Sequence, residues 1–177
     1  MAEIIYYVAA SLDGYIATPD GGVGWLAPFE SGAEDYGYAE FYASVNAVLL
    51  GSHTFEQSLT FGEWPYSGKP TWVFSGRDWP QLPPDVTATS RSPVDVVAQL
   101  DASGISRAWL VGGAALATSF RNAGLITEFI VSVMPVILGG GIPLFATDGP
   151  TLTLRLVSES VYDDGVVQLV YKPLTRG

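Results

Sequence analysis

The sequence predicts an α/β fold: a mixed, mainly parallel sheet flanked by helices, with an antiparallel hairpin at the C-terminus. Short apolar runs alternate with helix-like segments through most of the 177 residues, as in parallel strands joined by helical crossovers. Near the end, two β-like runs over 151–160 and 166–172 flank Asp163-Asp164-Gly165. Asp-Gly between two such runs indicates a hairpin. We expect one domain that spans residues 1–177.

The strands expected before the hairpin are short and apolar, and they span residues 3–11, 47–50, 71–75, 86–89, 107–111 and 126–135. The first is continuously apolar rather than alternating, which is typical of a strand buried on both faces. Helices are expected over residues 34–44, 54–61, 93–102 and 114–123. For the third of these, Ser92 followed by Pro93 is the signal of an N-cap with proline at the first helical position. A loop rich in Gly and Pro fills 12–29.

Composition excludes several classes of function. The net charge is −10, with only eight Lys and Arg residues and no basic cluster, so the surface repels nucleic acids and anionic membranes. The sequence has no Cys and a single His, which removes disulfides, thiolate catalysis and Cys- or His-rich metal sites. The apolar runs are too short for a membrane span, and no basic region precedes the first of them, so we expect a cytoplasmic protein. A hydrophobic content of 48% favours a homodimer.

Two glycine turns follow buried strands and precede helix-like segments. The later turn consists of small and apolar residues: Val111, Gly112, Gly113, Ala114, Ala115 and Leu116. The earlier turn places polar groups directly after a glycine: Gly51, Ser52, His53 and Thr54. Glycine lets the backbone approach a ligand closely, and a helix N-terminus suits a phosphate group. The two turns could hold the two ends of a dinucleotide, or they could be ordinary strand-to-helix turns; neither matches the Rossmann or Walker A pattern.

Five short segments in order carry a resemblance that spans nearly the whole chain. They are Ala-Ser-Leu-Asp-Gly at 10–14, Gly-Ser-His-Thr at 51–54, Phe-Ser-Gly at 74–76, Val-Gly-Gly-Ala at 111–114, and Pro-Val-Ile-Leu-Gly-Gly-Gly at 135–141 followed by Pro-Leu-Phe at 143–145. This set resembles the dihydrofolate-reductase-like fold. Within that fold it is most similar to the reductase domain of the bacterial bifunctional deaminase–reductase of riboflavin biosynthesis.

The resemblance implies NADPH as the hydride donor. It implies that the two glycine turns hold the pyrophosphate, with His53 as a cofactor contact, and that Ser75, Gly76 and Arg77 lie near the adenosine ribose and its 2′-phosphate. It also implies that Ala9, Ala10 and Ile16 line the nicotinamide pocket, and that the Gly112-Gly113 peptide is often cis. One departure weakens the preference for NADPH, because the family often has Arg where this chain has Ser52. The sequence also has no H-x-E motif or Cys for a zinc deaminase, so we expect only the reductase half.

The substrate side is predicted from carboxylates and aromatic residues. Asp13 and Asp35 are the candidates for orienting the substrate or supplying a proton through water, although turn chemistry and a favourable helix start explain them equally well. Trp25 and Phe41 are candidates for an aromatic wall, and core packing is the common alternative for Phe41. Leu138 and Gly139 complete the predicted substrate contacts.

These features predict an NADPH-dependent reductase of a small heterocycle, resembling 5-amino-6-(5-phosphoribosylamino)uracil reductase. Two alternatives stay open: a dihydrofolate reductase-type activity, and a module of the same fold that binds nucleotides or dimerises without turnover.

Overall fold

The computed structural model describes residues 1–146 and 149–174, and within them the predicted mixed sheet is confirmed. The main sheet has the strand order β5-β4-β3-β6-β1-β7-β10-β9. In chain order its strands are β1 (Glu3–Ser11), β3 (Ala47–Gly51), β4 (Thr71–Phe74), β5 (Val86–Thr89), β6 (Arg107–Gly112), β7 (Glu128–Met134), β9 (Leu154–Val161) and β10 (Val167–Pro173). The strands from β5 to β7 pair in parallel, and β10 and β9 pair antiparallel to their neighbours. The predicted C-terminal hairpin is therefore confirmed.

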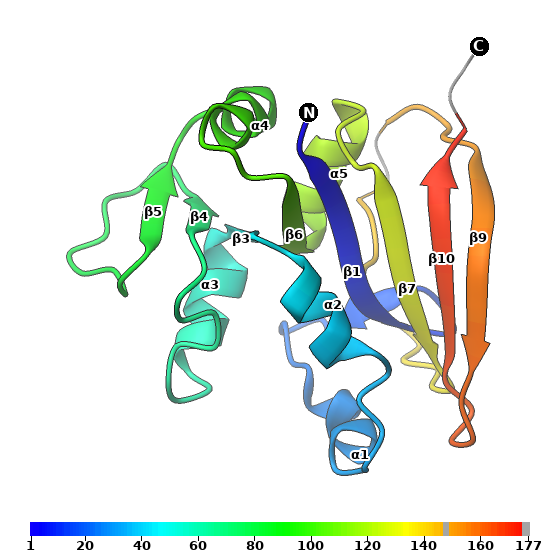
Figure 1. Ribbon diagram of the computed structural model, residues 1–177. Coiled ribbons are helices and arrows are strands. Elements are labelled where there is room, and N and C mark those ends of the chain that lie inside the picture. Colours follow the sequence, from blue (N-terminus) through cyan, green and yellow to red (C-terminus); the bar gives the residue numbers. More distant parts are fainter. Residues whose placement is uncertain (147–148, 175–177) are drawn as a thin grey trace.

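Helices cover both faces of the parallel part of the sheet (Figure 1). The helices on the two faces are α2 (Tyr38–Ser44), α3 (Ser52–Leu59), α4 (Pro93–Ala102) and α5 (Ala114–Asn122). The short helix α1 (Ala27–Glu30) and the 3-10 helix η1 (Gly24–Leu26) bury no residue. One core cluster joins α4 and α5 to one face, and a second joins α2 and α3 to the other. None of the described helices is long and apolar enough to cross a membrane.

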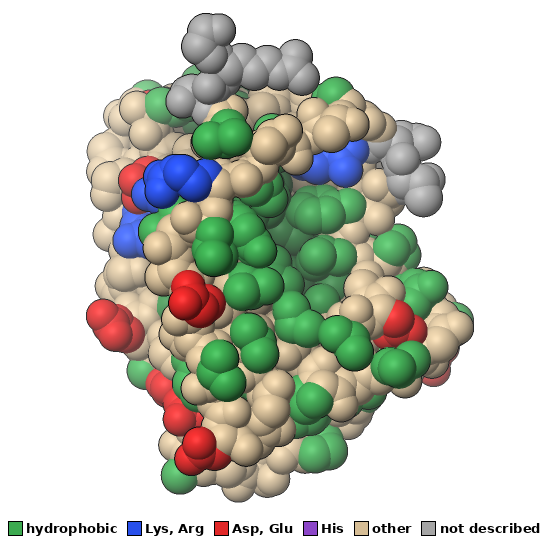
Figure 2. Space-filling model, turned by 90° about the vertical axis from the view of Figure 1, so that its right-hand side faces the viewer, with side chains coloured by type: hydrophobic (Ala, Val, Ile, Leu, Met, Phe, Trp, Pro, Cys, Tyr) green, Lys and Arg blue, Asp and Glu red, His purple; other side chains and the backbone are tan. Residues whose placement is uncertain are grey.

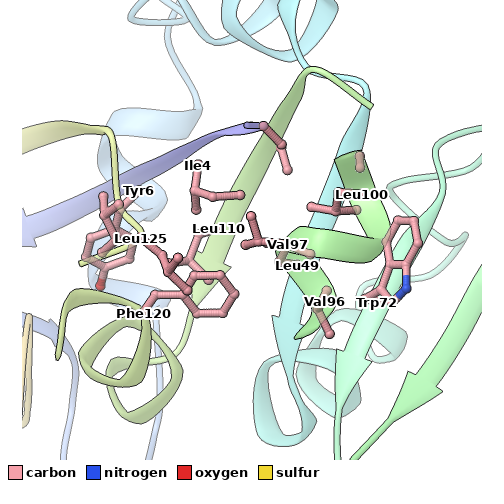
Figure 3. Packing of buried hydrophobic residues seen from close by; sticks show 14 of the residues in the cluster. Ile4, Tyr6, Leu49, Trp72, Val96, Val97, Leu100, Leu110, Phe120 and Leu125 are labelled. Carbon is pink, nitrogen blue, oxygen red and sulfur yellow. The ribbon is translucent and has the colours of Figure 1, made fainter. Parts of the chain in front are cut away.

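The core between the sheet and helices α4 and α5 is built from alternate strand residues (Figure 3). Ile4 and Tyr6 of β1 and Leu110 of β6 lie against Phe120 of α5, and all four side chains are fully buried. The neighbouring positions Ile5 and Trp109 face the other cluster, as the period of two in a strand requires. Both faces of the central strands are therefore buried, which explains the continuous apolar run in the first strand.

Two helices begin at residues other than the predicted ones. The helix predicted from residue 34 begins at Tyr38, because Gly37 takes a left-handed conformation with φ of 77° that a helix interior does not accept. The helix predicted from Thr54 begins at Ser52, directly after β3. By contrast, α4 begins as predicted, with the Ser92 hydroxyl accepting a hydrogen bond from the backbone N–H of Asp95.

The predicted loop over 12–29 holds more structure than the sequence indicated. It contains β2 (Tyr15–Ala17), which pairs antiparallel with β8 (Ile142–Pro143) in a second small sheet. It also contains η1 and the start of α1, so Trp25 lies in a 3-10 helix rather than in a loop. The pairing of β2 with β8 brings the chain after β1 next to the segment after β7.

The hairpin of β9 and β10 is amphipathic. One face of β10 carries the apolar side chains of Val167, Leu169 and Tyr171, and the residues between them point to the other face. Tyr171 packs against the core cluster of α5, so this apolar face lies on the α5 side of the sheet. Across the strands, Val167 pairs with Val133 and with Val161, which is 75% exposed. Figure 2 views the molecule from the side of β9 and β10 and shows hydrophobic side chains gathered over a hollowed surface. The apolar face of the hairpin thus extends the sheet beyond the cover of the described helices.

Candidate active site

The two glycine turns meet at the carboxyl end of the sheet. β3 and β6 are neighbours, and Leu50 pairs with Gly112. A Cβ atom on Gly51 would lie 3.5 Å from the Gly112 carbonyl oxygen, and one on Gly113 would lie 3.5 Å from Thr54 Oγ1. The turn before α3 and the turn before α5 are therefore in contact. The Gly112-Gly113 peptide is cis, as the resemblance implied.

The first turns of α3 and α5 present backbone N–H groups without a side-chain cap. Gly51 and Gly113 are the N-caps, and neither helix has a capping hydrogen bond from a side chain of the described residues. Helix α4 differs, since Ser92 caps it. Uncapped N–H groups and the positive end of the helix dipole favour a bound anion. Two adjacent helix starts of this kind fit a pyrophosphate, and at this strand junction an open α/β sheet commonly binds its ligands.

Small residues and close packing surround these turns. Ala114 is buried at 9% exposure, and Leu116 packs near Gly51. Val111 packs in the cluster on the side of α2 and α3. Ser52 and His53 occupy the first turn of α3, and Ala115 occupies the first turn of α5. The structure thus brings together the residues predicted to hold the pyrophosphate.

Arg77 lies beyond β4, in the turn after Ser75 and Gly76, but it is not a free cation. Its guanidinium pairs with the carboxylate of Glu56 on α3 and stacks 4.3 Å from the centre of the Trp79 ring. The backbone N–H of Arg77 donates to Ser75 Oγ at 3.2 Å. The sequence offered no signal for the partnership with Glu56, because 21 residues separate the two.

The residues predicted for the nicotinamide pocket lie where β1 ends and β2 begins. Ala9 and Ala10 pair with Ser132 and Val133 of β7. Ala10 is 2% exposed, whereas Ala9 is half-buried. Ile16 lies in β2 and is half-buried. These positions surround the end of β1, one strand away from the Gly112-Gly113 turn on β6.

Asp13 ties two segments of the site together. One carboxylate oxygen accepts from Ser11 Oγ at 2.7 Å and from the backbone N–H of Leu138 at 3.1 Å, and the other accepts from the N–H of Gly139 at 2.7 Å. The hydrogen bond from Ser11, followed by those from the two backbone groups, holds the pKa of Asp13 below its usual range. Asp13 is therefore ionised at neutral pH and suited to fixing the loop over 136–141 rather than to donating a proton.

Asp35 caps the start of α2. Its carboxylate accepts from the backbone N–H of Ala39 at 3.0 Å and of Gly37 at 2.9 Å, and these bonds lower its pKa. Asp35 is exposed and lies outside the helix in which it was predicted. The favourable helix-start role is thus present in the structure, and a contact with substrate stays a prediction.

A hydrogen-bonded group on the sheet beside α2 was missed by the sequence reasoning. Gln168 Nε2 donates to Ser132 Oγ and to the carbonyl oxygen of Tyr36, both at 3.0 Å. Burial raises the pKa of Tyr7 to about 12, and a hydrogen bond with Gln168 opposes this rise. The group joins β1, β7 and β10, so only the strand order could reveal it.

The two predicted aromatic contacts differ in their surroundings. Phe41 is 8% exposed and stacks on Tyr7 with ring centres 4.3 Å apart, so it packs in the core and offers little surface to a ligand. Trp25 is half-buried, and its indole Nε1 is buried without a hydrogen-bond partner in the described part of the chain. The indole nitrogens of Trp64, Trp72 and Trp79 are buried in the same way, so this property does not distinguish Trp25, and its contact with substrate stays a prediction.

Other surface features lie away from this region. A hollow lined by Arg121, Phe145 and Thr151 lies near the C-terminal end of α5, the end opposite Gly113. Among residues 1–146 and 149–174, no group of three or more His, Cys, Asp or Glu side chains could hold a metal ion. The adjoining glycine turns, with their uncapped helix starts, are the candidate cofactor site that the resemblance and the geometry both indicate.

Comparisons with known proteins identify relatives that match nearly the whole chain. The protein YwjB of Bacillus subtilis (strain 168) is 38% identical over 170 residues, which cover 96% of this chain and 97% of YwjB. A solved structure from Shewanella sp. PV-4, assigned provisionally to riboflavin biosynthesis, superposes with a TM-score of 0.88 at 31% identity, covering 98% of this chain and 99% of that one.

A more distant structure shows the shared fold. The diaminohydroxyphosphoribosylaminopyrimidine deaminase/5-amino-6-(5-phosphoribosylamino)uracil reductase of Thermotoga maritima superposes with a TM-score of 0.75 at 17% identity. The match covers 98% of this chain and 57% of that protein. The family model described as the RibD C-terminal domain matches residues 2–168. Since that match spans nearly the whole sequence, this chain belongs to the RibD C-terminal domain family.

Proposed function

We propose that this protein is an NADPH-dependent reductase that transfers hydride to a small, flat, polar heterocycle with a sugar-like arm. The observation that carries the proposal is the pair of adjoining, uncapped helix N-termini at Gly51 and Gly113. Family membership supports reductase chemistry, since the structural neighbour from Thermotoga maritima is a 5-amino-6-(5-phosphoribosylamino)uracil reductase and the one from Shewanella sp. PV-4 is assigned provisionally to riboflavin biosynthesis.

The residues present fit the proposed cofactor. The backbone N–H groups after Gly51 and Gly113 would hold the pyrophosphate, and the turn at Ser75 and Arg77 would hold the adenosine ribose. Ala9, Ala10 and Ile16 would bound the nicotinamide. Bound NADPH supplies the hydride, and the polypeptide supplies position and a pocket that excludes water.

The substrate would lie at the end of β1, between the loop over 136–141 and η1. Asp13 fixes the backbone of Leu138 and Gly139 there, and the half-buried Trp25 ring would bound the pocket. The half-buried phenol of Tyr7 and the amide of Gln168 add polar groups on the side of α2. Because both Asp13 and Asp35 are ionised at neutral pH, a proton would reach the product from water that they orient.

A direct test combines binding with turnover. NADPH binding should change the fluorescence of the Trp residues, and NADPH should be oxidised in the presence of a pyrimidine ribosylamine. Oxidation with a dihydropterin alone would favour the dihydrofolate reductase-type alternative. Binding without oxidation of NADPH by either compound would favour the non-catalytic module, and the absence of binding would contradict the proposal.

Replacing Asp35 tests the smaller of the two carboxylate contributions. Asp35→Ala removes both acceptor bonds at the start of α2. We expect a fall in turnover of about two- to tenfold, with the affinity for NADPH unchanged, because the frayed helix start lies on the substrate side. Steady-state kinetics and cofactor titration measure the two effects. Unchanged turnover would leave Asp35 with a capping role only.

We further propose that a second copy of the chain covers the apolar face of the hairpin, defined by Val131, Val133, Leu156, Val161, Val167, Leu169 and Tyr171. The register places Glu159 beside Leu169, so a charged side chain lies among the apolar side chains of this face. The register shift between Val170 and Tyr171 makes the edge irregular, which favours packing of faces over pairing of edges. Three strands of this length cover roughly 24 by 14 Å, about 340 Å², which is less than half of the roughly 800 Å² that each partner buries in a standard interface, so flanking residues would have to contribute the rest.

The substitution Leu169→Lys should dissociate this dimer. It places a charge at the centre of the face, whereas Val94→Lys, on exposed Val94 of α4, is the matched control. Light scattering after gel filtration should give a dimer for the parent and the control, and a monomer for Leu169→Lys. A monomeric parent, or a dimeric Leu169→Lys, would refute the interface.

A further inference from the structure

Glu56 and Arg77 form an ion pair at the place where the proposed adenosine ribose would lie. Their side chains are 43% and 52% exposed, so the pair is accessible to a ligand. The Trp79 ring holds the guanidinium from one side, and Trp79 itself packs edge-on against Phe55, which is fully buried on α3. Arg77 is therefore fixed against α3 rather than extended into solvent.

The positive charge of Arg77 is balanced by Glu56 in the absence of a ligand. Ser52 and Glu56 are four residues apart on α3, so they lie on one side of the helix, one turn from each other. Ser52 brings no charge, and the carboxylate of Glu56 offsets the guanidinium of Arg77. A 2′-phosphate bound to Arg77 would lie next to the Glu56 carboxylate and be repelled by it.

The two side chains have opposite preferences in dinucleotide recognition. A carboxylate beside the ribose accepts a hydrogen bond from the 2′-hydroxyl of NADH, whereas an arginine binds the 2′-phosphate of NADPH. We propose that Glu56 sets cofactor specificity by occupying Arg77, so that the protein uses NADPH but binds it no more than about threefold more tightly than NADH. This inference rests on the proposed function, because it presumes a dinucleotide at the glycine turns.

The test compares Glu56→Gln with Glu63→Gln, which removes the same charge from an exposed position shortly after α3. NADPH, NADH, adenosine 2′,5′-bisphosphate and adenosine 5′-monophosphate are titrated by calorimetry against the parent and both variants. Glu56→Gln should raise the affinity for the two 2′-phosphorylated ligands about fivefold, by removing one exposed like charge, and should not raise it for the other two. The gain should shrink at high salt.

The outcomes separate this inference from the proposed function. A parent that binds NADPH more than tenfold tighter than NADH, or equal gains in Glu56→Gln and Glu63→Gln, overturns the role of Glu56 and leaves the reductase intact. A parent that binds none of the four ligands overturns both. Arg77→Ala should abolish the gain when combined with Glu56→Gln, and persistence of the gain would also count against the pair.

Discussion

Gly113→Val is expected to abolish dinucleotide binding while the protein stays folded. A Cβ atom at Gly113 would make an ordinary 3.5 Å contact with Thr54 Oγ1, and the φ of −75° suits any residue. The γ-methyl groups would instead occupy the space in front of the N–H groups of α5, where the pyrophosphate would lie. Losing two charge-assisted hydrogen bonds weakens binding by on the order of a hundredfold or more. Calorimetric titration with NADPH measures the loss.

Gly32→Val is the matched control, since Gly32 is exposed and a Cβ there would meet only the Glu34 nitrogen, at 3.8 Å. The control should bind NADPH as the parent does, and circular dichroism should report a native fold for both variants. A folded Gly113→Val that binds NADPH with the affinity of the parent would show that the glycine turns do not hold the cofactor.

Asp13→Ala should reduce turnover by about ten- to a hundredfold and leave the affinity for NADPH nearly unchanged. The substitution removes the hydrogen bonds that hold the backbone of Leu138 and Gly139 beside the end of β1. The loop that is proposed to contact the substrate is then no longer fixed, so the substrate is positioned less accurately for hydride transfer. The glycine turns on β3 and β6 are not touched. Steady-state kinetics with NADPH binding measured separately distinguishes the two effects.

The pH dependence of stability gives a second readout for Asp13. Its pKa is lower in the folded protein than the value of about 3.9 expected when unfolded, so its contribution to stability is present above that value and is lost as the pH falls through the folded pKa. Asp13→Ala should therefore be less destabilising in acid than at neutral pH.

Asp20→Ala is the control for both Asp13 readouts, because Asp20 has a lowered pKa in a neighbouring turn but bonds to Thr18 and Gly22 within that turn. Equal losses of turnover in the two variants would contradict the loop-fixing role.

The sequence predicted the fold closely where local signals were strong. Ser92-Pro93 marked the start of α4, and Asp163-Asp164-Gly165 marked the hairpin, because capping and turn chemistry act within a few residues. The start of α2 was predicted too early because Glu34 and Asp35 resemble a first helical turn. In the structure Gly37 is the N-cap in a left-handed conformation, so the helix can begin only after it. The pairing of β2 with β8 joins segments more than 120 residues apart, and no local pattern announces it.

The site was predictable in part for the same reason. Each glycine turn is visible in the sequence, but their contact depends on β3 lying beside β6. The partners of Asp13, Gln168 and Arg77 come from distant segments, so the sequence could name Asp13 and Arg77 without showing that both are already engaged. Phe41 was named for a ligand and lies in the core, which shows how helical spacing of aromatic residues mostly reports packing.

A crystal structure of the protein soaked with NADPH tests the central claim most directly. We expect the pyrophosphate to lie between the first turns of α3 and α5, with the adenosine ribose beside Ser75 and Arg77 and the nicotinamide beside Ala10. Density for the dinucleotide at another place, such as the hollow lined by Arg121 and Phe145, would contradict the assignment of the glycine turns as the cofactor site.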